Sequence, residues 1–289
     1  MKGLAPGDHV AVDPNIYCGA CTPCRDGKKQ FCEHLQALGV TRDGGFAQYS
    51  AAPAAQCFKL APELPFEAGA MAEPLACCLH GIDAAGIRPG STVCVIGGGA
   101  IGLLMVQLAR LSGAAKVILS EPVELRRSAG LSVGADLAVD PLREDLSARV
   151  REAAGKSGAD VVIDCVGMDG KMSVLEKVEA AMKLQAGSKS AIEIASEAVR
   201  KCGTVSMVGV YGGRYNTFPL GNFWTRNVTL KMGQCPAQNY VQPILELIKE
   251  RKFDATDIIT HTLKLKDGVH GYSIFDNKED GCIKVVLKP

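Results

Sequence analysis

An apolar run, a cluster of glycines and a second apolar run follow one another in the middle of the chain. Residues 91–99 read STVCVIGGG, and residues 101–113 read IGLLMVQLARLSG. The first run is predicted to be a buried strand and the second a helix, so the glycines occupy the turn between them. Gly97, Gly99 and Gly102 have the spacing G-x-G-x-x-G. That spacing is a weak signal alone, but between a strand and a helix it is typical of dinucleotide-binding folds.

Each glycine has a physical role at such a turn. Gly97 permits the tight turn, Gly99 lets the backbone approach a pyrophosphate, and Gly102 allows the helix to pack closely against the strand. The start of the helix offers free N–H groups and a favourable dipole to phosphate. Glu121 ends the next apolar run, 19 residues after Gly102, where a carboxylate can accept hydrogen bonds from an adenosine ribose. The alternative for the glycines is a tight turn in an α/β protein that binds no nucleotide.

The charges near this position bear on the choice between NAD and NADP. Glu121 favours NAD, because the 2′-phosphate of NADP would meet a like charge there. Arg126 and Arg127 follow shortly afterwards, and an arginine can neutralise such a phosphate. Arg126 is therefore a candidate cofactor-binding residue, NAD is the predicted cofactor, and NADP stays open.

Strand-like and helix-like segments alternate through the same part of the chain. Strands that are apolar throughout and separated by helices predict a doubly wound parallel sheet, the Rossmann architecture of α/β proteins. Residues 1 to about 75 differ, because they are rich in glycine, proline and short β-like pieces. The further strands are predicted in the segments KVILSEP, ADLAVD, ADVVIDCVG and GTVSMVGVYGG.

Four cysteines gather in a polar loop near the start. Residues 18–32 read CGACTPCRDGKKQFC, which places thiols at Cys18, Cys21, Cys24 and Cys32. Packing explains them badly, since a free cysteine behaves as a small hydrophobe. Two overlapping C-x2-C elements and a fourth thiol supply all four ligands of a closed tetrahedral zinc site, whose role is then structural. An iron–sulfur cluster and unliganded thiols are the alternatives.

Composition excludes several classes of function. A net charge of +1 gives no electrostatic reason to expect a nucleic acid or an anionic membrane as partner. The 289 residues contain no secretory pattern and no apolar run long enough to span a bilayer, so we expect a cytoplasmic protein. Twelve cysteines in such a compartment favour metal binding over disulfides.

Together, the cysteine loop and the glycine turn resemble the zinc-dependent medium-chain dehydrogenase/reductase superfamily of alcohol and polyol dehydrogenases. The front half is similar to sorbitol-type enzymes in PGDHVAVDP, the cysteine loop and AEPLACCLHG, whereas RKCGTVSMVGVYGG and the C-terminal segment are similar to the formaldehyde dehydrogenase-like branch. The resemblance implies a Rossmann domain at 79–254 and a partial GroES-like catalytic domain, with its structural zinc lobe, at 1–78 and 255–289. It also implies an alcohol or polyol substrate and a homodimer or homotetramer.

The resemblance assigns roles to further residues. Glu73, in the E-P-L-A segment, matches an acid that binds the catalytic zinc or holds its water, so it is the candidate catalytic and metal-associated residue; an ordinary acid at a helix start is the alternative. Four positions match residues that, in enzymes of this family, contact the nicotinamide half or the pyrophosphate of the coenzyme: Cys165, Gly167, Gly209 and Lys284. For Lys284 an exposed strand lysine is the alternative.

One expected motif is absent from this sequence. The family's other catalytic zinc ligands lie in a segment with a G-H-E motif, and none of the five histidines is followed by an acid. We therefore expect either an NAD-dependent zinc oxidoreductase or a truncated homologue that binds NAD and structural zinc with little turnover. A zinc-free quinone-reductase-like enzyme is a weaker alternative. Residues 173–185 and 190–201 are predicted to form two additional amphipathic helices.

Overall fold

The computed structural model describes residues 3–155, 158–169, 190–211, 218–252 and 254–289. The chain forms two compact units. The first unit comprises Met1–His80 and Gln234–Pro289, and the second comprises Gly81–Gly233.

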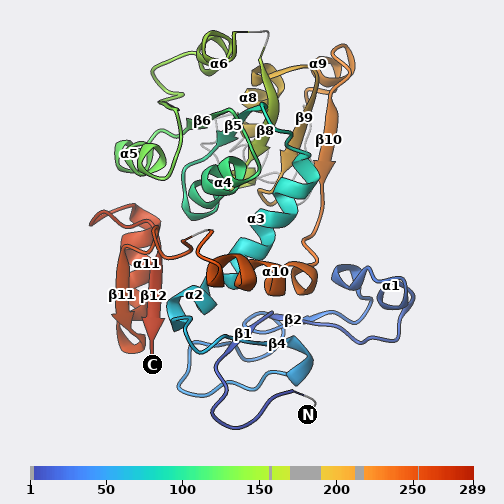
Figure 1. Cartoon of the computed structure of the whole chain (residues 1–289), viewed down its shortest axis with the longest axis vertical. Coiled ribbons are helices and arrows are strands. Elements are labelled where there is room, and N and C mark those ends of the chain that lie inside the picture. The colour runs from blue at the N-terminus through green and yellow to red at the C-terminus, as the bar shows by residue number, and fades with distance from the viewer. Residues whose placement is uncertain (1–2, 156–157, 170–189, 212–217, 253) are drawn as a thin grey trace, which may run out of the picture. The chain divides into compact units, whose positions relative to one another are not determined.

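The second unit contains a six-stranded parallel sheet (Figure 1). The strand order is β10-β9-β8-β5-β6-β7, so the chain runs from β5 outward to one edge and then returns to build the other side. This is the doubly wound topology that the sequence predicted. The strands are β5 (Thr92–Ile96), β6 (Lys116–Ser120), β7 (Leu137–Val139), β8 (Ala159–Asp164), β9 (Val199–Met207) and β10 (Thr229–Met232).

Helices cover both faces of this sheet. Cys94 and Ile96 of β5 share a buried cluster with Val150 of α6 (Leu146–Ala154) and Ile192 of α8 (Ser190–Ala198). The alternate strand residues face α4 (Ala100–Leu111) and α5 (Glu124–Ser132): a Cβ on Gly130 of α5 would lie 2.2 Å from Leu119 Cδ2. All residues of β5 are buried, as expected of a parallel strand with helices on each side.

Two sequence predictions concern the segment before β9. The helix predicted over 190–201 ends at Ala198, because Val199 already begins β9, which pairs with β8. The helix predicted over 173–185 lies outside the described residues. A short helix, α9 (Leu220–Trp224), precedes the edge strand β10.

The first unit is built from short pieces. Strand β1 (Val10–Val12) pairs with β4 (Cys57–Lys59), β2 (Asn15–Ile16) pairs with β3 (Gln36–Ala37), and β11 (His261–Lys264) runs parallel to β12 (Val285–Lys288). The helices are α1 (Thr22–Arg25), α2 (Phe66–Ala70), α3 (Ala72–Ala85), α10 (Ala237–Lys249) and α11 (Gly268–Asn277), of which α3 continues into the second unit.

The position of α10 differs from the expected boundary. Residues 79–254 were expected to form the coenzyme domain, but residues 234–254 group with the first unit. Cys235 Sγ donates a hydrogen bond to the Ala76 carbonyl at 3.5 Å, and the rings of His80 and Tyr240 lie 5.6 Å apart. The helical spacing of apolar residues shows which face of α10 is apolar, but it does not show which of the two units that face packs against.

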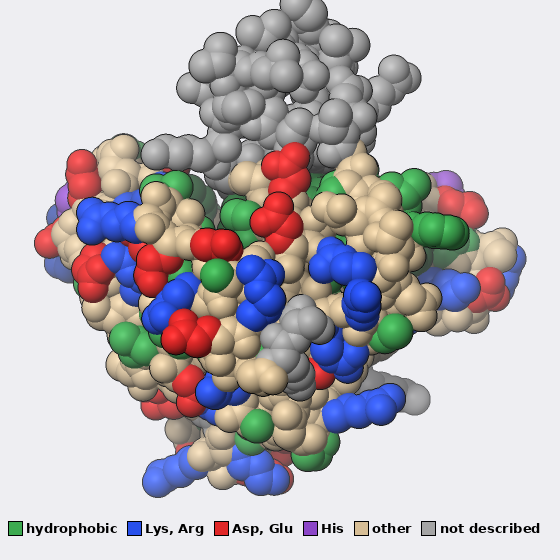
Figure 2. Space-filling view, turned by 90° about the horizontal axis from the view of Figure 1, so that it is seen from above, with side chains coloured by type: hydrophobic (Ala, Val, Ile, Leu, Met, Phe, Trp, Pro, Cys, Tyr) green, Lys and Arg blue, Asp and Glu red, His purple; other side chains and the backbone are tan. Residues whose placement is uncertain are grey.

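The surface charges and the hydropathy of the helices agree with the near-neutral, mixed composition of the sequence. Figure 2 shows lysine and arginine side chains interspersed with aspartate and glutamate on the face it presents, with no field of one sign there. Among the described residues, no helix is long and apolar enough to cross a membrane.

Candidate functional site

The four predicted zinc ligands converge in the loop between β2 and β3. The Sγ atoms of Cys18, Cys21, Cys24 and Cys32 all lie within 4.8 Å of one another. Backbone N–H groups hold the sulfur atoms in this arrangement. The Cys21 nitrogen donates to Cys18 Sγ at 3.3 Å, and the Cys18 nitrogen donates to Cys32 Sγ at 3.3 Å. We call these four residues the cysteine tetrad.

Two cysteines of the tetrad have shifted pKa values. Backbone N–H groups of Ala20 and Cys21 lower the pKa of Cys18 to about 6. Burial and the neighbouring thiols raise the pKa of Cys24 to about 12. The case for a metal rests on geometry: four soft sulfur donors whose atoms all lie within 4.8 Å of one another are what structural zinc prefers, and a bound cation would balance their charge as thiolates.

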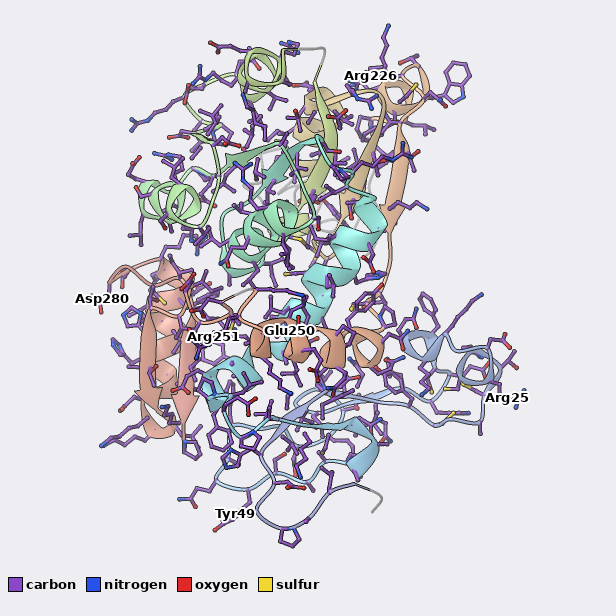
Figure 3. The ribbon with its side chains drawn as sticks, in the orientation of Figure 1. Arg25, Tyr49, Arg226, Glu250, Arg251 and Asp280 are labelled. Carbon is purple, nitrogen blue, oxygen red and sulfur yellow. The ribbon has the colours of Figure 1, made fainter. Side chains whose placement is uncertain are left out.

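Neighbouring residues hold the lobe that carries the tetrad. Asp13 is fully buried and accepts hydrogen bonds from Asn15 N–H at 2.9 Å and from the Tyr17 hydroxyl at 2.8 Å. Tyr17 in turn packs against the tetrad sulfurs. Arg25 lies at the end of α1 at the outer part of this lobe, and it donates to the Ala20 carbonyl (Figure 3).

In the second unit, the glycine turn has the predicted form. Gly97 has φ +93°, a backbone conformation that glycine tolerates and other residues rarely adopt. A Cβ on Gly102 would lie 1.7 Å from the Gly97 carbonyl oxygen, so only glycine allows α4 to start this close to the turn. Gly99 is the N-cap of α4 and makes no side-chain cap hydrogen bond.

Glu121 and Arg126 lie beside this turn. Glu121 is 3% exposed; its Oε2 accepts Gly98 N–H at 2.7 Å and its Oε1 accepts Val123 N–H at 2.8 Å. Each oxygen keeps a second lone pair for a ribose hydroxyl. A Cβ on Gly99 would lie 3.9 Å from an Arg126 terminal nitrogen, which places this guanidinium at the turn.

The two adjacent arginines have different surroundings. Arg127 donates to the Glu121 and Pro122 carbonyls and pairs with Glu124 and Asp140. Arg126 has no ion pair with any described residue, and its buried Nε has no hydrogen-bond partner among them. Arg126 is therefore the arginine with donors to spare for a ligand.

The residues predicted after β8 and β9 also come together. A Cβ on Gly209 would lie 2.2 Å from Gly167 N, and the Met168 N–H donates to the Val210 carbonyl at 3.0 Å. Cys165 N–H donates to the Ile96 carbonyl at 2.9 Å, which joins this segment to β5. Cys165, Gly167 and Gly209 thus lie at the same carboxyl edge of the sheet as the glycine turn, where open α/β sheets bind ligands.

Glu73 and Lys284 lie in the first unit. Glu73 is in the first turn of α3, and Cys77, one turn later, donates its thiol to Glu73 Oε1 at 3.5 Å. Burial raises the pKa of Glu73, and burial lowers the pKa of Lys284, although the Glu73 charge opposes this second shift. The thiols of Cys77 and Cys235 interact, and this contact, followed by burial, raises the pKa of Cys77.

The tetrad is distinctive among the described residues. It is the one group of three or more His, Cys, Asp or Glu side chains there whose ligand atoms all lie within 4.8 Å of one another. Glu73 accepts a hydrogen bond from the Cys77 thiol but does not belong to such a group. The described residues therefore fit a structural zinc and do not by themselves assemble the three ligands of a catalytic zinc.

Two residues of this edge were missed by the sequence analysis. Asp164 and Tyr211 share a hydrogen bond 47 positions apart in the chain. The only sequence signal was an acid ending an apolar strand, and nothing marked the tyrosine.

The described residues define an α/β protein with a doubly wound parallel sheet and a separate lobe that carries four converging thiols. Residues 1–62 match the alcohol dehydrogenase GroES-like domain, and residues 100–183 match the zinc-binding dehydrogenase domain. A zinc-type alcohol dehydrogenase-like protein of Bacillus subtilis is 39% identical over 99% of this chain and 80% of its own length. The chain belongs to the zinc-type medium-chain alcohol dehydrogenase family.

Other relatives show the breadth of the family. The L-arabinitol 4-dehydrogenase of Aspergillus niger is 31% identical, over 99% of this chain and 72% of its own. The solved structure of a zinc-binding dehydrogenase from Sinorhizobium meliloti 1021, bound to NADP, is 32% identical with a TM-score of 0.83, covering 100% of this chain and 79% of the other.

Proposed function

We propose that the protein transfers hydride between a small alcohol or polyol and a nicotinamide coenzyme, with NAD(H) preferred. The glycine turn beside Glu121 carries this proposal. Glu121 Oε2 accepts a hydrogen bond from Gly98 N–H at 2.7 Å, and the turn leads directly into the N-terminus of α4, where the helix dipole favours a pyrophosphate. The family membership and the polyol dehydrogenase among the relatives support the reaction class.

The two units have different roles in this proposal. The second unit binds the coenzyme through Gly97, Gly99, Gly102, Glu121 and Arg126. The first unit, with α10 added to residues 1–78 and 255–289, serves as the catalytic domain and carries the structural zinc. Lys284 is proposed to approach the pyrophosphate, as the resemblance implied.

Glu73 is the proposed contribution of this chain to the catalytic metal. A zinc ion in such a position polarises the alcohol oxygen. Catalysis of this kind needs donors beyond those that the described residues group together. The burial of Glu73 and its hydrogen bond from the Cys77 thiol support a role beyond that of a surface acid at a helix start.

Coenzyme binding and turnover test the proposal separately. We expect the purified chain to bind NADH, measured by fluorescence titration, and to form NADH from NAD with a member of a panel of primary alcohols, secondary alcohols and polyols. The panel is repeated with NADP. Failure of NADH and NADPH to bind at millimolar concentration would contradict the proposal.

A second candidate is coenzyme and zinc binding with little turnover. The specific observation in its favour is that the tetrad alone, among the described residues, has a full set of metal ligands. Zinc analysis separates the two: about one zinc per chain with NADH binding and no turnover supports the second candidate, whereas two zincs with chelator-sensitive turnover support the first.

Assembly and location follow from the resemblance. We propose a cytoplasmic homodimer or homotetramer, to be tested by light scattering of the purified chain and by cell fractionation.

A further inference from the structure

A buried carboxylate lies where β8 ends. The Asp164 side chain is fully buried, and no lysine, arginine or histidine among the described residues forms an ion pair with it. Its Oδ1 accepts Val166 N–H at 2.9 Å and Gly167 N–H at 3.2 Å. Its Oδ2 accepts the hydroxyl of Tyr211. One carboxylate thus connects the segment after β8 to the segment after β9.

Backbone contacts reinforce this connection. The Asp164 carbonyl accepts Val208 N–H and Gly209 N–H, each at 2.9 Å. A Cβ on Gly167 would lie 2.5 Å from Val210 N, so the two segments touch without intervening side chains. Residues 165–167 and 208–211 form what we call the clasp.

The free-energy cost of burying the Asp164 carboxylate indicates that its hydrogen bonds fix the geometry of the neighbouring segments. A buried carboxylate without a cation costs free energy unless hydrogen bonds satisfy it. Burial raises the pKa of Asp164, and the hydrogen bonds from Tyr211, Val166 and Gly167 oppose that shift. An apolar residue at this position would avoid the desolvation cost of a buried carboxylate. It would, however, remove the acceptor of the Val166 and Gly167 N–H groups and of the Tyr211 hydroxyl.

The clasp borders the glycine turn. A Cβ on Gly97 would lie 2.6 Å from Val166 Cγ2 and 3.5 Å from the Cys165 carbonyl carbon. Strand β5 lies between β6, which Glu121 directly follows, and β8, which ends at Asp164. A dinucleotide with its adenosine ribose at Glu121 and its pyrophosphate at the turn therefore extends its other half towards β8 and β9.

We propose that Asp164 and Tyr211 are positioning residues that hold the clasp in one arrangement for the nicotinamide half of the coenzyme. Neither side chain needs to touch the coenzyme, because their effect is to preorganise the backbone groups of residues 165–167 and 208–211. The inference rests on the proposed function, since it requires a nicotinamide coenzyme.

The test compares NADH with ADP-ribose, which lacks the nicotinamide ring. Tyr211→Phe removes one hydroxyl and keeps the ring, which packs against the core cluster. We expect NADH affinity to fall about three- to tenfold, the range for one hydrogen bond, and ADP-ribose affinity to stay unchanged. Tyr49→Phe is the matched control, because Tyr49 is 92% exposed and belongs to the first unit (Figure 3); both affinities should stay unchanged.

A double variant tests whether the two residues act through their shared hydrogen bond. We expect Tyr211→Phe to have less effect in the Asp164→Asn background than in the wild type. Equal losses for NADH and ADP-ribose, or unchanged affinity for both, would overturn the positioning role while leaving coenzyme binding intact. A wild-type chain that binds ADP-ribose and NADH equally well would also overturn it. Absence of binding of either ligand to the wild type would refute the proposed function and this inference together.

A measurement on the wild type covers the case in which a variant fails to fold. The N–H groups of Val166 and Gly167 are expected to exchange with solvent at least tenfold more slowly than the N–H of Tyr49, which is 92% exposed and whose N–H has no hydrogen bond with any described residue. Equally fast exchange would show that the clasp is not held in one arrangement.

Discussion

At Gly102, the start of a helix and the preceding turn meet through backbone atoms. The contact leaves no room for a methyl group, since a Cβ would lie 1.7 Å from one backbone oxygen and 2.8 Å from the carbonyl carbon of Gly97. Backbone cannot rotate away as the end of a side chain can. The absence of a side chain at Gly102 therefore decides how close α4 starts to the glycine turn.

Gly102→Ala is expected to abolish tight coenzyme binding. The turn and α4 must separate, so we predict at least a tenfold loss of NADH affinity and a destabilisation of about 1–3 kcal/mol. Titration and thermal melting measure the two effects. Gly221→Ala, in α9 of the same unit, is the control, because a Cβ there meets nothing within 4 Å. Equal behaviour of the two variants would contradict the assigned packing role.

Arg126 and Arg127 are neighbours with different predicted effects. Arg126→Ala should lower affinity for NADP(H) about tenfold and change NAD(H) affinity less, because its guanidinium lies at the turn and forms no ion pair with any described residue. Arg127→Ala should mainly lower thermal stability, since Arg127 binds the Glu121 carbonyl and pairs with Asp140. Titration with both coenzymes and melting curves separate these outcomes. A uniform loss of both coenzymes in Arg126→Ala would argue against a role at the 2′-phosphate.

At the scale of an element, the lobe between β2 and β3 has little apolar core of its own. Its buried apolar group consists of three tetrad cysteines with Tyr17 packed against them. A segment this small with so few packed side chains depends on cross-links or metal for its order. The tetrad therefore provides the stability that packing cannot.

Cys21→Ser is expected to remove zinc and loosen this lobe. A hydroxyl is a poor replacement for a thiolate on zinc, so bound zinc should fall by at least half and the lobe should become protease-sensitive. Metal analysis and limited proteolysis test this. Cys57→Ser, a half-buried cysteine of the same unit outside the tetrad, should keep normal zinc. Normal zinc and proteolysis in Cys21→Ser would contradict a structural metal at these thiols.

Across the whole molecule, several carboxylates have a lowered pKa. Hydrogen bonds and ion pairs lower the pKa of Asp8 through Lys59 and of Glu67 through Lys288. At Asp136 burial raises the pKa, but Arg110 and the Val117 N–H outweigh it and leave the pKa below its ordinary value. Such groups take up protons more readily when unfolded, so their stabilisation is present above the unfolded-state pKa and is lost as pH falls through the folded-state pKa.

The melting temperature should therefore fall as the pH drops below about 4. Asp164 and Asp257 oppose this partly, because burial raises their pKa and acid favours their folded form. Asp136→Asn should melt lower at pH 7 and show a shallower acid decline. Asp276→Asn, an exposed residue, should follow the wild-type curve. An Asp136→Asn decline as steep as that of the wild type would contradict the assigned pair with Arg110.

Sequence patterns predicted the parts of this molecule whose causes are local. The glycine turn, the cysteine tetrad and the alternation of strands and helices each depend on residues close together in the chain. Backbone sterics, ligand spacing and hydrophobic period act over such distances. Residues 170–189, where one helix was predicted, lie outside this comparison.

Contacts between distant segments decided the rest. No local pattern places α10 against α3 or pairs Asp164 with Tyr211. Nor does one explain why, among the described residues, Arg127 forms ion pairs and Arg126 forms none. Glu73 illustrates the division: its place at the start of a helix is readable from the sequence, whereas its burial near Lys284 is a property of the folded unit. The amino-acid sequence by itself determined which helices and strands form and which reactive side chains they carry. Packing between elements decided which of those groups meet, because side-chain contact depends on distance in space and not along the chain.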